Sequence, residues 1–238
     1  DEHFFTKKKG YATTFCDLKR RRVFDVTLGR SEASLRGYLL RLKGRQQTRV
    51  VVMDLSETYR NIVRRYFRRA LIVADRFHVI RLINHRFMMQ WRLLDPESKY
   101  NRGLISLMRR HRDKLEDRQK ESLDRYFEMH PAVGGLYYFK QKLCELMRLK
   151  SKNQKACAEL IPQFLECIEE LKANPFEHMV SLGRTLENWS EEIVRMWRFS
   201  RTNSITEGFH NKMEMISRRA YGFRNFKNYR LRVRAACC

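Results

Sequence analysis

Two short apolar runs in the first third of the chain each end in an aspartate and lead into a helical pattern. RVVVMDL covers residues 49–55 and contains Asp54, and ALIVAD covers residues 70–75 and ends at Asp75. Runs of this length are typical of fully buried strands, and each is followed by a helical pattern, as in an α/β fold. Because open α/β sheets bind ligands at the carboxyl ends of their strands, both aspartates are candidate site residues.

The neighbouring segments extend this α/β pattern. Residues 10–18 and 21–29 are rich in β-branched and aromatic side chains and predict an antiparallel hairpin. Residues 31–44 and 57–69 carry apolar side chains at helical spacing. The predicted element order is βββαβαβα, on the expectation that a first strand precedes Asp1.

Strand patterns disappear between residues 96 and 200, where helical periodicity takes over. Pro162 indicates either a kink or a helix boundary in this block. Residues 151–200 hold 6 basic and 8 acidic side chains, unlike the rest of the chain. This shift predicts a separate face or subdomain that is turned away from a polyanionic partner.

The charge balance of the whole chain predicts such a partner. Fifty Lys and Arg residues face 27 Asp and Glu residues, which gives a net charge of +23 and an isoelectric point near 10.2. A nucleic acid is the first candidate, and an anionic membrane surface is the second. No apolar run approaches the roughly 18 residues of a membrane span, so a soluble intracellular protein is expected. The start at Asp1, without an initiator Met, suggests a piece of a longer protein.

Three acids are candidates for chemistry: Asp1, Asp54 and Glu207. Glu207 falls in a basic segment, near the start of a helix that Asn203 or Ser204 could cap. Carboxylates that converge from several elements would bind two Mg²⁺ ions, because Mg²⁺ prefers hard oxygen ligands. Alternatively, Glu207 could complement the helix dipole, and Asp1 could be a terminal residue without a role.

The two strand-end aspartates also have ordinary structural explanations. Asp54 could cap the helix that follows it, although Ser56 can do so as well. Asp75 could act as a cap or pair with Arg76 or Arg81.

Four segments together resemble the catalytic domain of a DDE transposase, and more narrowly the ISL-three family of bacterial insertion-sequence transposases. The segments are DEHF at 1–4, VVMDLS at 51–56, VADRFHVIRLIN at 73–84 and TEGFHNKMEMISRRAYGFRNFKNYRLRV at 206–233. The match covers nearly the whole chain in order, and the last two segments are its most specific parts.

The resemblance implies a particular α/β fold. The expected architecture is a ribonuclease-H-like mixed sheet flanked by helices, with a large all-α insertion before the last catalytic helix. The core would comprise residues 1–95 and 201–238, and the insertion would comprise residues 96–200. The family's first strand precedes the DE pair and is expected to be missing here, together with upstream DNA-binding elements.

The resemblance also implies roles for individual residues. Asp1, Asp54 and Glu207 would be the catalytic acids that hold two Mg²⁺ (or Mn²⁺) ions for metal-dependent DNA cleavage and strand transfer. Asp75 and His78 would support the active site or the DNA, while a half-buried structural histidine is the alternative for His78.

The partners implied are the insertion-sequence ends and target DNA, held by a homodimer or a larger synaptic assembly in the bacterial cytoplasm, at the nucleoid. Two other functions stay open. The chain could be a non-catalytic DNA-binding protein derived from a transposase, or a ribonuclease-H-like nuclease that cleaves without joining.

Two basic clusters are candidates for contacts with DNA phosphates, which position the nucleic acid and make binding salt-dependent. One occupies the helical segment at 57–69, where Arg60 and the arginines after it are expected to form a polar face that points away from the apolar stripe. The other surrounds the aromatic residues near the C-terminus. Alternatively, the aromatic residues could be core and the cations could form a solvated face. The predicted DNA-binding residues are Arg64, Arg65, Arg68, Arg69, Arg218, Arg219, Arg224, Lys227, Arg230 and Arg232.

Overall fold

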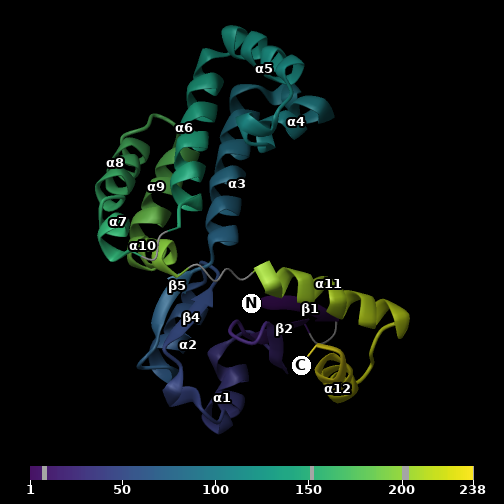
Figure 1. The fold of residues 1–238 in the computed structure, drawn as a ribbon. Helices are drawn as coiled ribbons and strands as arrows, with labels where there is room; N and C mark the ends of the chain where they lie inside the picture. Colours follow the sequence, from purple (N-terminus) through teal and green to yellow (C-terminus); the bar gives the residue numbers. More distant parts are fainter. Residues whose placement is uncertain (7–9, 151–152, 200–203, 238) are drawn as a thin grey trace. The chain divides into compact units, whose positions relative to one another are not determined.

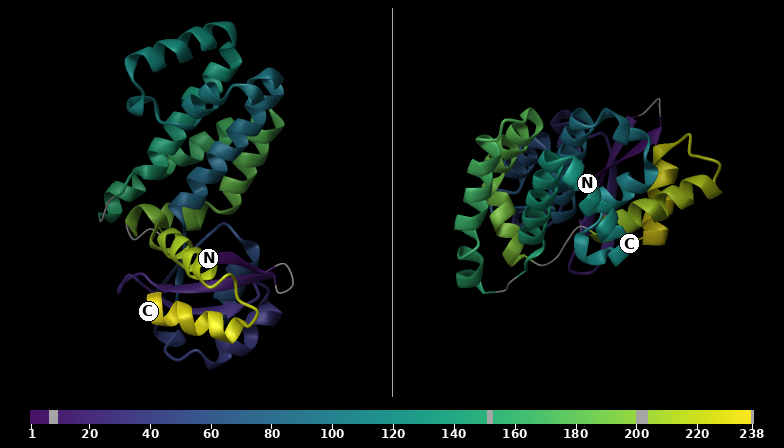
Figure 2. Two further views of the ribbon diagram at one scale, coloured as in Figure 1. Left: turned by 90° about the vertical axis from the view of Figure 1, so that its right-hand side faces the viewer. Right: turned by 90° about the horizontal axis from the view of Figure 1, so that it is seen from above.

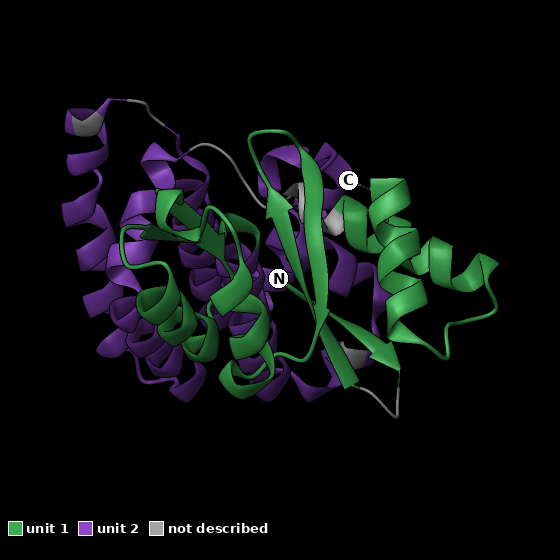
Figure 3. Cartoon of the chain, turned by 90° about the horizontal axis from the view of Figure 1, so that it is seen from below, with its two compact units in different colours: residues 1–77, 201–238 green, residues 78–200 purple. Residues whose placement is uncertain are grey.

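The computed structural model describes residues 1–6, 10–150, 153–199 and 204–237, except for the side chains of Lys99, Gln154 and residues 204–207 (Figure 1). The chain divides into two compact units (Figure 3). Unit 1 comprises residues 1–77 and 201–238, and unit 2 comprises residues 78–200.

A three-stranded antiparallel sheet forms the centre of unit 1. It comprises β1 (Glu2–Thr6), β2 (Gly10–Asp17) and β3 (Arg22–Leu28) in that order. The predicted hairpin is confirmed as β2 and β3, with Thr13 opposite Thr27.

The sequence pattern predicts no strand directly after Asp1, but the structure has one there. The strand that pairs with β2 follows Asp1, with Glu2 opposite Thr13. The pairing reaches Asp1 itself, whose carbonyl accepts a hydrogen bond of 2.8 Å from the Thr14 N–H. The charged start of DEHFF concealed this strand, because edge strands tolerate polar side chains.

The two apolar runs are confirmed as strands, and the structure pairs them in parallel. They are β4 (Val50–Met53) and β5 (Leu71–Ala74), with Met53 opposite Ala74. Helix α1 (Glu32–Arg41) precedes the short helix η1 (Arg45–Gln47), and α2 (Glu57–Tyr66) connects the two strands. The mixed α/β class is thereby confirmed. The strands are described as two separate sheets, so the ribonuclease-H-like arrangement stays a prediction.

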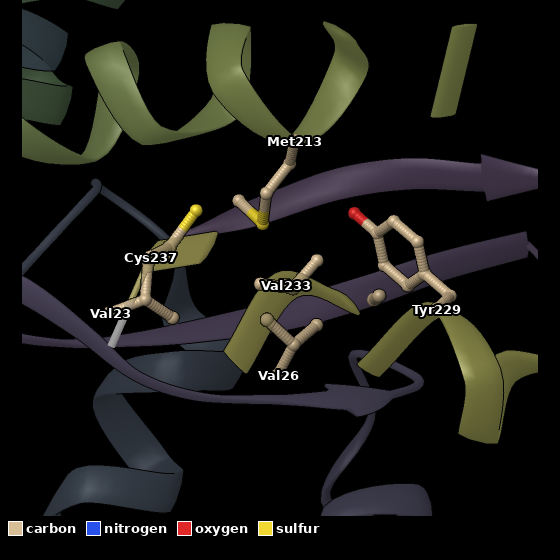
Figure 4. Close-up of a cluster of buried hydrophobic side chains, with 7 residues drawn as sticks. Val23, Val26, Met213, Tyr229, Val233 and Cys237 are labelled. Atoms are coloured by element: carbon tan, nitrogen blue, oxygen red, sulfur yellow. The ribbon is translucent and has the colours of Figure 1, made fainter. Parts of the chain in front are cut away.

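The C-terminal helices α11 (Ser204–Arg219) and α12 (Phe226–Cys237) lie across the antiparallel sheet (Figure 2). Their apolar side chains enclose one core with those of β2 and β3, shown in Figure 4. The core interpretation is confirmed for three aromatic residues, since Tyr229 is buried and Phe223 and Phe226 pack partly buried against it. The buried members are Ala12, Val23, Val26, Met213, Tyr229, Val233 and Cys237.

Every described helix or strand of unit 2 is a helix, as predicted for this part of the chain. Pro162 lies in the first turn of α8, so its interpretation as a helix boundary is confirmed. Two tryptophans anchor the packing: the indole N–H of Trp91 donates to the Tyr126 hydroxyl at 2.8 Å, and that of Trp197 donates to the Leu146 carbonyl at 2.9 Å.

The elements of this region are α3 (Arg76–Leu94), η2 (Pro96–Tyr100), α4 (Arg102–Arg109), η3 (Arg112–Lys114), α5 (Asp117–Met129), α6 (Pro131–Arg148), α7 (Gln154–Ala158), α8 (Ile161–Lys172), α9 (Glu177–Asn188) and α10 (Ser190–Arg198). None of the helices in the described residues combines the length and the apolar character that a membrane span requires.

Candidate active site

Asp54 and Asp75 follow neighbouring parallel strands at the same edge of their sheet. The Asp75 N–H donates to the Met53 carbonyl at 2.7 Å, which continues the register of Met53 with Ala74 by one residue. Because paired strands lie about 4.8 Å apart, the two aspartates start from neighbouring backbone positions. Asp75 is buried and Asp54 is half-buried.

The capping interpretation holds for one of these aspartates. Ser56 is the N-cap of α2 and accepts a hydrogen bond from the Tyr59 N–H at 3.4 Å. Asp75 accepts from the Phe77 N–H at 3.2 Å in the first turn of α3. Asp54 is thus not needed as the cap of α2, whereas Asp75 contributes to the start of α3.

Asp1 lies in the electrostatic neighbourhood of both aspartates. Its carboxylate is 13% exposed and accepts a hydrogen bond of 2.8 Å from the Glu2 N–H. The backbone nitrogen of Asp1 is buried and lies within electrostatic range of the carboxylates of Asp54, Glu2 and Asp75. Residues 1, 54 and 75 are far apart in sequence, yet unit 1 gathers their carboxylates in one region.

Tyr59 connects the helix after Asp54 to the strands beside Asp1. Its hydroxyl lies 3.0 Å from the Thr13 hydroxyl and 3.2 Å from a carboxylate oxygen of Glu2. Burial raises the pKa of Tyr59, so the phenol keeps its proton at neutral pH. This contact holds α2 against the antiparallel sheet.

Helix α11 reaches the same region through His210. The Nδ1 of His210 lies 3.9 Å from Oδ2 of Asp1, and its Nε2 lies 3.3 Å from the Thr14 hydroxyl. The predicted third acid, Glu207, belongs to α11, but its side chain lies outside the described residues.

A second histidine completes a polar network that sequence reasoning missed. His3 contacts the Thr14 hydroxyl at 3.1 Å and the Tyr229 hydroxyl at 2.8 Å. Burial, followed by the nearby charge of His210, lowers the pKa of His3 to about 4, so its imidazole is neutral at neutral pH. The sequence spacing could have indicated both histidines. His3 is two residues after Asp1 along a strand, and His210 is three residues after Glu207 along a helix, so each shares a face with a predicted catalytic acid.

His78 lies in the first turn of α3, three residues after Asp75, and is half-buried. Its burial fits the structural interpretation, and its predicted supporting role stays a prediction.

The first basic cluster lies at the end of α2 and in the turn that follows. Arg64, Arg65, Arg68 and Arg69 are all exposed, and Arg65 pairs with Glu32 at 2.6 Å. The neighbouring arginine of the predicted polar face behaves differently. Arg60 is 5% exposed and pairs with Glu57 at 3.1 Å, so the expectation that it faces away from the apolar stripe is wrong.

The second basic cluster surrounds the connection between α11 and α12. Its exposed members are Arg218, Arg219, Arg224, Lys227 and Arg232.

Arg230 differs from the other cations of the second cluster because it forms a bidentate pair. Its Nε donates to Asp25 Oδ1 at 2.8 Å, and its Nη2 donates to Oδ2. Burial alone would raise the pKa of Asp25, but hydrogen bonds from Arg230 and the Val26 N–H, with the charge of Arg230, lower it overall. A role in joining α12 to β3 therefore competes with the predicted role in DNA binding.

The net charge is concentrated in one unit. Unit 1 holds 28 basic and 10 acidic residues, a net charge of +18, whereas unit 2 holds 22 and 17, a net charge of +5. The unit that gathers Asp1, Asp54 and Asp75 thus carries most of the attraction for a polyanion.

A different group of metal-type donors occurs in unit 2. Ligand atoms of His111, Asp113 and Glu145 lie within 4.8 Å of one another, and both carboxylates are exposed. Among the described side chains, Asp1, Asp54 and Asp75 do not form so tight a group.

Comparison with known proteins identifies the class. The family model of the ISL-three (ISL3) DDE transposases, described as Transposase, matches residues 1–233, and the chain belongs to this family. The resemblance of the four sequence segments is confirmed. The chain is also 26% identical, over 246 aligned positions, to the transposase for insertion sequence element IS1001 of Bordetella parapertussis. That match covers 99% of this chain and 59% of the relative's length. No solved structure matches the chain.

Proposed function

We propose that unit 1 is the catalytic core of a transposase that cuts and joins the DNA of an insertion sequence. The observation that carries this proposal is the meeting of three segments. Asp1 on the antiparallel sheet, Asp54 at the end of β4 and the helix α11 adjoin one region of unit 1.

The third acid is proposed from the periodicity of α11. His210 contacts Asp1, and positions three residues apart share one face of a helix. Position 207 therefore belongs to the helix face that carries His210. Glu207 would complete the acidic set with Asp1 and Asp54.

The donor chemistry of this set fits divalent ions. Carboxylates are the hard ligands that Mg²⁺ and Mn²⁺ take, and several partly buried carboxylates in one region repel one another without a cation. Asp1, Asp54 and Glu207 would hold two Mg²⁺ (or Mn²⁺) ions. When bound, the ions supply activation of the attacking oxygen and stabilisation of the leaving oxygen in phosphoryl transfer.

The remaining polar residues of the region would orient this set. Asp75 fixes the first turn of α3 through Phe77, and Tyr59 holds α2 beside β1 and β2. His210 would restrain the carboxylate of Asp1, while His3 stays neutral and contacts Thr14. His78 would support the start of α3.

The exposed arginines of both clusters would bind DNA phosphates along unit 1. They would hold the element ends and target DNA independently of sequence. Two ends must be joined together, which requires a homodimer or a larger synaptic assembly acting at the bacterial nucleoid.

The decisive experiment uses Asp54→Asn, which keeps the size of the side chain and removes its charge. We expect calorimetry to show weaker Mn²⁺ binding, and labelled element-end DNA to remain uncut in the presence of Mg²⁺. Retention of metal binding and of strand transfer by this variant would rule out the assigned site.

Asp117→Asn is the matched control, because Asp117 has a side chain that is 92% exposed on α5 of unit 2. It should leave metal binding and cleavage unchanged. A native protein that binds DNA without metal-dependent cleavage would be a DNA-binding derivative. Cleavage without joining on the same labelled DNA would identify a nuclease.

A further inference from the structure

The turn between α11 and α12 holds a tyrosine in an unusual conformation. Helix α11 ends in a Schellman arrangement, in which the Gly222 N–H donates to the Ser217 carbonyl at 2.8 Å and the Tyr221 N–H donates to the Arg218 carbonyl at 3.0 Å. The left-handed position of this motif, φ = 52°, is occupied by Tyr221. Glycine is the usual residue there, because a Cβ atom is strained in this region.

Packing in the described structure does not compensate for this strain. The relative exposure of Tyr221 is 101%, whereas the neighbouring aromatic residues Phe223 and Phe226 pack against the core. A strained backbone that presents a fully exposed aromatic ring is a feature from which function can be inferred.

Tyr221 lies in the chain between Ala220 and Gly222, which both line a groove on the surface of unit 1. The groove has a volume of about 610 Å³, within the range of small-molecule sites. Its apolar lining includes Gly222, Phe223 and Leu231, and its polar lining includes Arg224, Asn225 and Arg232.

This combination matches the chemistry of an unpaired nucleotide. The faces of a base stack on aromatic and apolar side chains, and the phosphate pairs with arginine. Paired bases in a duplex are stacked on each other and offer phosphates but no free faces. The exposed ring of Tyr221 therefore favours single-stranded DNA over duplex DNA.

We propose that the groove beside Tyr221 binds unpaired nucleotides of single-stranded DNA, with a base stacked on Tyr221 and phosphates held by Arg224 and Arg232. This inference extends the proposed function, since it gives unit 1 a second DNA site that does not use the acidic residues. Strand cutting and joining expose unpaired nucleotides, which is the DNA form that such a site would retain.

The test measures binding of a fluorescein-labelled oligothymidylate of about ten nucleotides, a length typical of single-strand sites, by fluorescence anisotropy in EDTA. EDTA prevents metal-dependent cleavage. We expect Tyr221→Ala and Arg232→Ala each to weaken binding about tenfold, while Tyr221→Trp retains it. In competition with an unlabelled duplex of equal length, Tyr221→Ala should weaken duplex binding much less than single-strand binding, whereas Arg232→Ala should weaken both because Arg232 contacts phosphates.

Two matched controls come from unit 2. Tyr100 is 77% exposed and Arg125 is exposed on α5, and replacing either with alanine should not change binding of the oligonucleotide. Circular dichroism on every variant checks that the chain is folded.

The proposal is overturned if Tyr221→Ala binds the oligonucleotide as tightly as the unaltered chain. It is also overturned if that variant loses single-stranded and duplex binding by the same factor, since the groove would then be a general phosphate contact. Photochemical cross-linking with 5-iodouracil in the oligonucleotide adds a direct readout, because the labelled peptide should contain Tyr221.

Failure of this proposal and failure of the proposed function are distinguishable. Asp54→Asn should bind the oligonucleotide normally while losing cleavage. If Asp54→Asn still cleaves, the catalytic assignment fails, and the oligonucleotide-binding measurements alone decide whether the groove binds single-stranded DNA. If Tyr221→Ala has no effect while Asp54→Asn is inactive, only the groove fails.

Discussion

At the scale of single residues, two side chains occupy positions that cost stability. Tyr221 adopts a left-handed conformation with its ring in solvent, and Lys140 places an ammonium group inside unit 2 with 4% of the residue exposed. Each has a measurable consequence.

Replacing Tyr221 with glycine should stabilise the chain. Glycine removes the Cβ strain at positive φ, and the gain is partly offset by the greater freedom of glycine in the unfolded chain. We expect a rise of about 0.5–1 kcal/mol in the free energy of unfolding, measured by urea denaturation. Lower stability of this variant would mean that the ring contributes to the fold, which would weaken the case for a binding role.

Lys140 should make stability depend on pH. Its Nζ donates to the Met108 carbonyl at 2.6 Å and lies over the rings of Phe87 and Tyr137. Burial lowers the pKa of Lys140 from 10.5 to about 8.

Between these two pKa values the unfolded chain binds more protons than the folded one, so stability rises with pH. We expect the free energy of unfolding to increase by up to about 3 kcal/mol across this window. Thermal melting at pH 8 and at pH 10 measures this increase. Lys140→Met should abolish this increase, and an unchanged pH profile in the variant would refute the assignment.

At the scale of elements, α12 is fixed to β3 by an apolar core and one ion pair. Val233 and Tyr229 pack on Val23 and Val26, and Arg230 holds Asp25 at the margin of that core. Because α12 also lines the groove, its docking determines whether the groove exists.

Arg230→Ala should therefore destabilise unit 1. It leaves the Asp25 carboxylate, 10% exposed, without its bidentate partner. Breaking a buried pair costs about 3–5 kcal/mol, and the partial exposure of Arg230 reduces our expectation to about 2 kcal/mol. Arg232 is an exposed neighbour on α12, so the control variant Arg232→Ala should have little effect on the urea midpoint.

The acid sensitivity provides an independent check of this pair. Because the pKa of Asp25 is lowered in the folded chain, its ionised carboxylate stabilises the fold above the ordinary aspartate pKa of about 4. This stabilisation is lost as the pH falls below that value. The difference between native and Arg230→Ala stability should shrink between pH 7 and about pH 3. A constant difference would argue that the arginine acts through packing alone.

At the scale of the whole molecule, the uneven charge predicts which unit binds duplex DNA. Unit 1 carries a net charge of +18 and both basic clusters. If six or more phosphates are neutralised, affinity should fall by about a thousandfold or more between 50 and 200 mM salt.

The double variant Arg68→Ala/Arg69→Ala should reduce the slope of log affinity against log salt by about two. Arg118→Ala/Arg125→Ala, which removes two exposed arginines of α5 in unit 2, should leave the slope unchanged. Equal effects of the two double variants, measured by titration at several salt concentrations, would contradict a DNA surface confined to unit 1.

The sequence alone determined the features that depend on local pattern. Apolar runs ending in Asp54 and Asp75 predicted two buried strands with a carboxylate at the end of each, because burial selects apolar residues. The structure pairs these strands in parallel. Helical periodicity predicted the all-α block, and four segments, most specifically those at 73–84 and 206–233, identified the family.

Tertiary structure decided the features that depend on contacts between distant segments. No local pattern distinguishes the paired Arg230 from the exposed Arg232, or the core residue Tyr229 from the solvent-exposed Tyr221. The position of His210 beside Asp1 likewise follows from the docking of α11 on the sheet. Side-chain roles of this kind are set by which elements pack together, since packing brings together residues that the sequence separates by 200 positions or more.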